Sequence, residues 1–128
     1  MEQQELNELT ERVIGAAVEV HRTLGPGLLE SAYEAALCRE LQLRNLSFRR
    51  QVSLPVRYKG ISLNCGYRID ILVAERLPLE LKAVTELADI HLAQLLTYLR
   101  HGDFRLGLLL NFNTVKITAG IRRVANRF

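Results

Sequence analysis

Hydrophobic residues near the start of the chain recur with the spacing of an amphipathic helix. Successive members of the series are three or four residues apart, and they are Leu6, Leu9, Val13, Ala17, Val20 and Leu24. This spacing places them on one helical face and predicts a helix over about residues 5–23. The segment LGPG interrupts the pattern, because its two glycines relax the backbone and Pro26 cannot continue the helix. A second helix is then expected over about residues 28–43.

From Phe48 the hydrophobic period changes from that of a helix to that of a strand. Apolar and polar residues alternate through the segments FRRQVSLPVRY, ISLNCGYRIDILV and LPLELKAV. This alternation predicts a three-stranded meander with a turn at Lys59 and Gly60. Pro55 cannot donate a backbone hydrogen bond, so it indicates that the first strand lies at an edge of the sheet.

The last third of the chain combines a helical pattern with an apolar strand. The segment TELADIHLAQLLTYLRHG predicts a helix that ends at Gly102. The residues on or near its buried face are Ile90, Leu92, Leu95, Leu96 and Leu99. FRLGLLLNF is an apolar run of strand length, as expected of a strand buried on both faces, and residues 120–124 predict a final short strand. The expected order is α, α, β, β, β, α, β and a final β, in a mixed α/β (α+β) fold.

Length and composition indicate a globular protein with one domain. The 128 residues are 48% hydrophobic, and we expect a single domain over residues 1–128. No apolar run approaches the length of a membrane span, and the acidic N-terminus lacks the pattern of a signal peptide, so a cytoplasmic location without membrane association is expected. The net charge of +3 only weakly favours a polyanionic partner. Cys38 and Cys65 lack the spacing of a metal site and are expected to be buried free thiols.

The segment YRIDILVAERLPLELKAV places charged residues inside two otherwise apolar strands. If residues 74–76 form a three-residue hairpin loop, Asp70 lies directly opposite Glu80 on the neighbouring strand. Strand alternation then gives Ile69 and Ile71 a shared face that excludes Asp70. A four-residue loop would instead move Glu80 to the face opposite Asp70.

Two opposed carboxylates require compensation, because side chains at facing positions have Cβ atoms only about 4.5–5.5 Å apart and like charges there repel. Lys82 is one source of compensation, since it follows Glu80 by two positions and shares its face. A divalent cation bound by both carboxylates is another. A third interpretation is a solvated hairpin face with mixed charges, as antiparallel sheets commonly have.

Further polar residues are grouped on the predicted helices. Their spacing puts four of them on one side of the last helix: His91, Gln94, Tyr98 and His101. On the second helix, Glu30 and Tyr33 lie three residues apart, shortly after Gly27. Each also has a purely structural interpretation: the tyrosines as boundary aromatics, Gln94 as an exposed polar residue, and Glu30 as a partner of the helix dipole.

Taken together, these motifs resemble the PD-(D/E)xK nuclease superfamily, in particular its RecB-like and Cas4-like branch. The resemblance consists of the element order, an Asp late in one strand, an ExK motif on the next, and a following helix with QxxxY. GLLESAY is similar to the signature of the GxxExxY protein family within that superfamily, and EVHRTLGPGLLESAYEAAL, GYRIDILV, LELKAV and AQLLTYL extend the resemblance over nearly the whole chain. Ile69 departs from the pattern, since the superfamily often has Pro there. The resemblance implies a restriction-endonuclease-like core, with a central mixed sheet flanked by helices.

The resemblance also implies a catalytic role for four residues and a ligand set for Mg²⁺ or Mn²⁺. Asp70 and Glu80 would bind the cation with the backbone carbonyl of Leu81, and Glu30 would reach it directly or through water. Lys82 would orient or activate the attacking water. Hard oxygen ligands suit Mg²⁺, and a bound cation suits phosphodiester hydrolysis, so this chemistry is self-consistent.

Gln94, Tyr98 and Tyr33 would bind substrate or support the site. The expected function is that of a metal-dependent nuclease or phosphodiesterase acting on nucleic acid, with DNA favoured. A non-catalytic nucleic-acid- or protein-binding module on a nuclease-like fold is the main alternative, and a different metal-dependent hydrolase is a further one. A homodimer is expected, because one small domain offers little surface to hold a duplex.

Overall fold

Five strands form the central sheet in the computed structural model, which describes residues 2–127. Their spatial order is β1 (Phe48–Ser53), β4 (Arg68–Val73), β5 (Leu77–Lys82), β6 (Leu106–Asn111) and β7 (Ile121–Ala125). Only β5 and β6 run parallel, and the other neighbouring pairs are antiparallel. The mixed sheet is therefore a meander joined to a parallel crossover.

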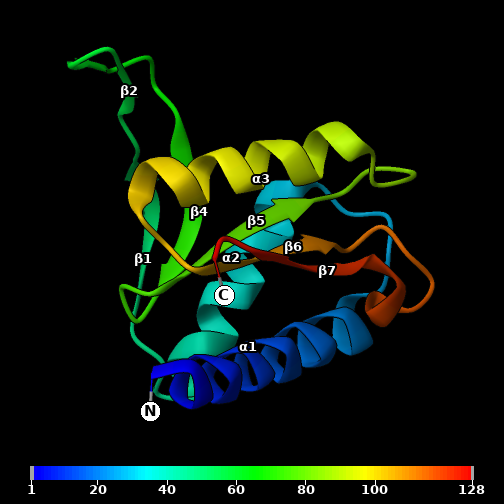
Figure 1. Ribbon diagram of the computed structural model, residues 1–128. Coiled ribbons are helices and arrows are strands. Elements are labelled where there is room, and N and C mark those ends of the chain that lie inside the picture. The colour runs from blue at the N-terminus through cyan, green and yellow to red at the C-terminus, as the bar shows by residue number, and fades with distance from the viewer. Residues whose placement is uncertain (1, 128) are drawn as a thin grey trace.

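Helices cover both faces of this sheet (Figure 1). One face carries α1 (Glu2–Leu24) and α2 (Glu30–Leu43), and the other carries α3 (Asp89–Gly102). Because parallel strands cannot be joined by a tight turn, α3 forms the crossover from β5 to β6. A short 3₁₀ helix, η1 (Ile117–Gly120), precedes β7. This arrangement confirms the expected α+β fold and is consistent with a restriction-endonuclease-like core.

A small second sheet departs from the predicted three-stranded meander. β2 (Val56–Tyr58) and β3 (Ile61–Leu63) pair only with each other and form an arm that projects from the molecule (Figure 1). The prediction of one long first strand is wrong because the chain leaves the central sheet at Leu54 and Pro55, and proline cannot donate to a ladder. At the tip, Lys59 and Gly60 both have positive φ (46° and 84°), as a two-residue hairpin turn requires.

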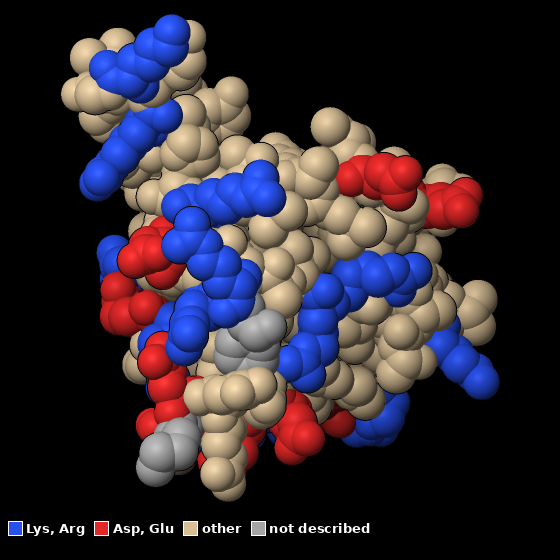
Figure 2. All heavy atoms as spheres, in the orientation of Figure 1, with Lys and Arg blue, Asp and Glu red and all other residues tan. Residues whose placement is uncertain are grey.

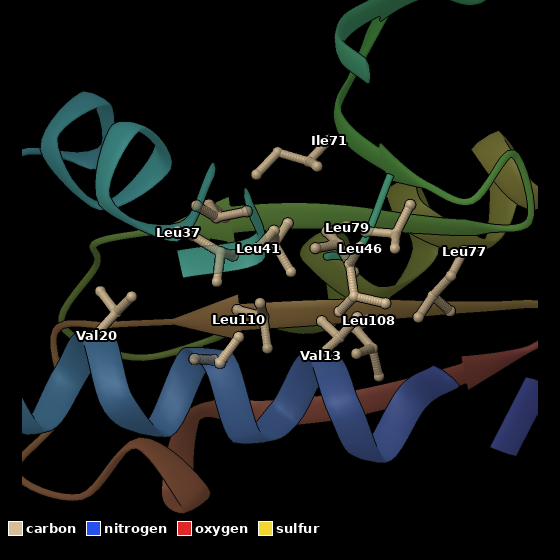
Figure 3. Close-up of a cluster of buried hydrophobic side chains, with 14 of the residues drawn as sticks. Val13, Val20, Leu37, Leu41, Leu46, Ile71, Leu77, Leu79, Leu108 and Leu110 are labelled. Atoms are coloured by element: carbon tan, nitrogen blue, oxygen red, sulfur yellow. The ribbon is translucent and has the colours of Figure 1, made fainter. Parts of the chain in front are cut away.

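The larger part of the core lies between the α1/α2 layer and the sheet. Val13, Leu37, Leu79 and Leu110 meet there, from two helices and two strands (Figure 3). Every residue of β6 is buried, which confirms the prediction of a strand covered on both faces. The placement of Ile90 on or near the buried face of α3 is wrong, because this residue is 70% exposed.

The two cysteines lie in different environments. Cys38 is buried in α2, as expected, whereas Cys65 is exposed, because it belongs to the connection between β3 and β4 outside both sheets. Among residues 2–127, no helix combines the length and the apolar character needed to cross a bilayer.

Candidate active site

The β4–β5 hairpin has the predicted three-residue loop. Val73 pairs with Leu77, and the antiparallel register continues to Ile71 opposite Leu79. Ala74 in the loop adopts a positive φ of 53°, so the turn is tight enough to hold this register. The next two residues along the strands are Asp70 and Glu80, as expected for opposed carboxylates.

At these two acids, side chains replace the backbone ladder. The backbone N–H of Asp70 donates to Oε2 of Glu80 over 2.9 Å, and the N–H of Leu81 donates to Oδ2 of Asp70 over 2.8 Å. Each carboxylate thus accepts a hydrogen bond from the opposite strand, and the two strands separate at this point. Each acid is therefore positioned by the backbone of the other acid's strand, as a preorganised site requires.

The strand alternation predicted around Asp70 is wrong at one residue. Ile71 packs with the α1/α2 core, but Ile69 packs in a separate cluster with Leu72 and Tyr98. The backbone therefore turns at Asp70, where its N–H bonds to Glu80 instead of a strand partner. Strand β1, on the other side of β4, pairs with it before and after Gln51 but not at Gln51 itself, whose φ is 50°. This irregularity gives the Asp70 carboxylate its own orientation.

Burial sets the protonation of both acids. Glu80 is only 7% exposed, and burial followed by the charge of Asp70 raises the pKa of Glu80 from 4.5 to about 8. Burial is also the main cause that raises the pKa of Asp70, while the hydrogen bond from Leu81 opposes the increase. Ionisation of both carboxyl groups is therefore unfavourable, and a nearby cation would favour the fully ionised form.

Lys82 supplies part of the compensating charge. It lies at the end of β5, and its ammonium lowers the pKa of both Asp70 and Glu80. Its strand neighbour is Asn111 of β6, a buried residue that was not expected at the site from the sequence. The Asn111 side chain accepts from the N–H of Val84 and donates to its carbonyl, over 3.1 and 3.0 Å. Asn111 thereby fixes the chain where it leaves the ExK motif.

Two acids of α2 face the same region. The charges of Glu30 and Glu34 both raise the pKa of Asp70, and the effect of Glu34 is the larger. Glu30, the exposed first residue of α2, was expected at the site from the sequence, whereas Glu34 was not. A spacing of four residues from Glu30, which puts both acids on one helical face, would have been the signal. Glu34 accepts hydrogen bonds from Arg50 and Gln51, so it also ties α2 to the edge strand β1.

The opposite helical layer contributes Gln94 and Tyr98. Nε2 of Gln94 donates to the Tyr98 hydroxyl over 3.1 Å, and Tyr98 is 6% exposed. Burial and then the charge of Glu80 raise the pKa of Tyr98, so this tyrosine lies near the acid pair. The histidines of the predicted stripe have other partners: His91 accepts from the N–H of Ala88, and His101 from the N–H of Arg57.

The structure places Tyr33 inside the protein, where it can support the site but does not face solvent. Tyr33 is fully buried and stacks on Phe112, with ring centroids 4.7 Å apart. Its hydroxyl donates to the carbonyl of Gly25 and accepts from the N–H of Leu28. Tyr33 therefore supports the site indirectly, by ordering the loop that leads into α2 and Glu30.

The donor set fits a hard divalent cation, although it is smaller than expected. Within residues 2–127, no three or more His, Cys, Asp and Glu side chains gather closely enough to hold a metal ion, so Glu30 does not join the acid pair in such a cluster. Asp70 and Glu80 each use one oxygen in the hydrogen bonds described above. Their other oxygens and the Leu81 carbonyl are ligands of the type that Mg²⁺ and Mn²⁺ prefer.

Comparison with known proteins identifies the family. Searches of curated proteins and of solved structures gave no match. A family model described as the PD-(D/E)XK nuclease superfamily matches residues 7–124, from α1 to β7, and so includes every candidate site residue. The chain belongs to the PD-(D/E)XK nuclease superfamily.

Proposed function

We propose that this protein is a metal-dependent nuclease that hydrolyses phosphodiester bonds in nucleic acid, with DNA as the expected substrate. We further propose that residues 1–128 form one nuclease-like domain of the GxxExxY family, within the RecB-like and Cas4-like branch. The observation that carries the proposal is the pair Asp70 and Glu80, held by reciprocal backbone hydrogen bonds with Lys82 close by.

Asp70, Glu80 and the carbonyl of Leu81 would hold Mg²⁺ or Mn²⁺. When bound, such a cation supplies positive charge for the phosphate oxygens and lowers the pKa of coordinated water. Glu30, at the start of α2, would reach the same place directly or through a water molecule. The buried setting of Glu80 strengthens these electrostatic interactions, since little solvent separates the charges.

Lys82 and the Gln94–Tyr98 pair would act on the other reactants. Lys82 lies close enough to both carboxylates to lower their pKa, so its ammonium would orient the attacking water or a phosphate oxygen. Gln94 and Tyr98 are hydrogen-bonded to each other on the α3 side, where they would support substrate phosphate. Together with Glu30 from α2, side chains from both helical layers would then act at one end of β4 and β5.

A non-catalytic binding module is the second candidate function. It is favoured by the small number of acids at the site. Glu34 raises the pKa of Asp70 more than Glu30 does, but its carboxylate is already hydrogen-bonded to Arg50 and Gln51. In that case the acid pair and Lys82 would serve binding or assembly. A homodimer is proposed for either function, because two copies would double the surface that one small domain presents to a duplex.

Cleavage assays separate the two candidates. Purified protein is incubated with single-stranded, double-stranded and branched DNA and with RNA, in Mg²⁺, in Mn²⁺ and in EDTA. We expect cleavage only with a divalent cation, and we expect Asp70→Ala to reduce it by at least about a thousandfold. Glu75→Ala, which removes an exposed carboxylate from the loop of the same hairpin, is the matched control and should cleave normally. No cleavage of any substrate would favour the binding module.

A further inference from the structure

An apolar groove lies between the projecting arm and α3, beside the acid pair. Its volume is about 450 Å³, and its walls include Val56, Leu63, Tyr67, Ile90, Thr97 and Tyr98. Cavities of this size are typical of small-molecule sites. Neither the acids nor Lys82 line it, so the groove is a separate feature of the molecule.

The groove walls expose flat and apolar surface to solvent. Tyr67 is 44% exposed and Ile90 is 70% exposed. The Tyr67 ring lies near the Tyr98 ring, with centroids 6.2 Å apart and planes tilted by 59°. Aromatic faces are the surfaces on which unstacked bases rest in many nucleic-acid-binding proteins. Gln94 also lines the groove and offers an amide that both donates and accepts hydrogen bonds.

The same residues connect the groove to the acid pair. Gln94 and Tyr98 line the groove and are hydrogen-bonded to each other. Tyr98 also lies close enough to Glu80 for the Glu80 charge to raise the pKa of the tyrosine. Tyr67 precedes Asp70 by three positions on the chain that leads into β4. A strand whose phosphate lies at Asp70 and Glu80 therefore has the groove next to it.

The arm carries positive charge without compensating acids. No Asp or Glu occurs between Gln51 and Ile69, whereas Arg57, Lys59 and Arg68 lie in this stretch. Within residues 2–127, none of these three forms an ion pair. Figure 2 shows the Lys and Arg atoms of the arm in blue at the upper left. This surface favours an anionic occupant.

We propose that the groove binds an unpaired nucleobase of the strand whose phosphate lies at Asp70 and Glu80. The base stacks on Tyr67, the Gln94 amide contacts its edge, and the basic residues of the arm bind the neighbouring phosphates. A base within a duplex is already stacked and paired, and it must leave the helix to enter such a groove. The protein is therefore selective for single-stranded or locally unpaired nucleic acid. This inference rests on the proposed function, but it concerns binding and does not require cleavage.

Cys65 provides a direct probe of the groove. It lines the groove and is exposed, whereas Cys38 is buried, so native protein presents one accessible thiol. Alkylation of Cys65 by iodoacetamide is followed in EDTA, with a single-stranded 12-nucleotide oligo(dT) or with the oligo(dT)·oligo(dA) duplex of the same length. We expect the single strand to slow alkylation at least about threefold and the duplex to have little effect.

Three outcomes of this experiment would overturn the inference. They are no protection by single strands at saturating concentration, equal protection by the duplex, and protection that appears with protein concentration alone. The last result would identify the groove as a contact between copies of the chain.

Substitutions test the groove by fluorescence anisotropy with labelled oligo(dT) in EDTA. Tyr67→Ala should weaken single-strand binding about tenfold, a typical loss for one stacked base. Val115→Ala, at a 90% exposed apolar residue outside the groove, is the matched control and should bind normally. Normal binding by Tyr67→Ala would contradict the stacking role.

Charge and chemistry are tested separately in the same assay. Arg57→Gln with Lys59→Gln should weaken binding and reduce its salt dependence, whereas Lys116→Gln, at an exposed lysine that does not line the groove, should not. Single-strand binding without any cleavage would contradict the proposed nuclease function but support the groove as the binding site for an unpaired base. Cleavage with unchanged binding by the groove variants would contradict the groove alone.

Discussion

The two ends of the β4–β5 hairpin use the same pair of strands in different ways. At the turn end, Ile71, Val73, Leu77 and Leu79 are joined by the backbone ladder and are buried in the core. At the open end, Asp70 and Glu80 accept hydrogen bonds from the backbone of the opposite strand. The turn end stabilises the fold, and the open end holds charge in a position that a fully paired ladder would not permit. The predictions below test this division, from the largest expected effect to the smallest.

Lys82→Ala should affect chemistry far more than cation binding. The substitution removes the ammonium but leaves the oxygens of Asp70, Glu80 and Leu81, so we expect cleavage to decrease at least about a hundredfold. Affinity for Mn²⁺, measured by calorimetry, should change less than about threefold. Lys116→Ala is the control for loss of a lysine. A parallel loss of cleavage and cation affinity would show that Lys82 only maintains the ligands.

Leu79→Ala should destabilise the protein more than any conservative change at the open end. Leu79 is fully buried, and truncation of such a residue costs about 2–5 kcal/mol of unfolding free energy. Glu80→Gln keeps an oxygen that accepts from Asp70 and replaces a carboxyl group that burial keeps largely protonated near neutral pH, so it should cost less than about 1 kcal/mol. Urea denaturation in EDTA measures both. A larger loss in Glu80→Gln would mean that the charged pair stabilises the fold.

The free energy of unfolding should depend on pH through Glu80. Its folded-state pKa is raised from 4.5 to about 8, so between these values the folded state keeps a proton that the unfolded state releases. Stability from this group is therefore present at low pH and is lost as pH increases through this window, with a slope of at most about 1.4 kcal/mol per pH unit. Denaturation of wild type and Glu80→Gln in EDTA should differ in this slope. Parallel pH profiles would contradict the assigned pKa.

Tyr33→Phe should have a small effect, confined to stability. It removes the hydroxyl that bonds to Gly25 and Leu28, and each such hydrogen bond contributes about 1 kcal/mol. Cation affinity should change less than about twofold, since the buried Tyr33 hydroxyl bonds to the backbone of Gly25 and Leu28 and not to the acid pair. Thermal unfolding and calorimetry measure the two quantities, with Tyr58→Phe on the exposed arm as the control. A strong loss of cation affinity would restore a direct role for Tyr33.

The sequence predicted those features that depend on local spacing. The three helices, the hairpin loop at Ala74 and the apolar strand β6 follow from hydrophobic period and turn length, and the structure confirms them. The position of Asp70 opposite Glu80 follows from the same count, because strand register is fixed by loop length.

Other features depend on tertiary contacts and could not be predicted. The chain leaves the sheet at Pro55, just after Leu54 makes a last backbone hydrogen bond to Tyr67, because proline cannot donate the next one, and the arm therefore forms a separate sheet. The turn of the backbone at Asp70 arises from its hydrogen bond to Glu80, and Glu34 approaches Asp70 only when α2 packs on the sheet. The burial of Tyr33 could not be predicted either, because the motif that contains it carries no information on burial.

Cation binding by the open end of the hairpin is the central claim, and calorimetric titration with Mn²⁺ and Mg²⁺ tests it most directly. Wild-type protein should bind at about one site per chain, Asp70→Ala should lose at least about tenfold in affinity, and Glu75→Ala in the hairpin loop should bind as wild type does. No binding by the wild type, or equal binding by Asp70→Ala, would contradict the account.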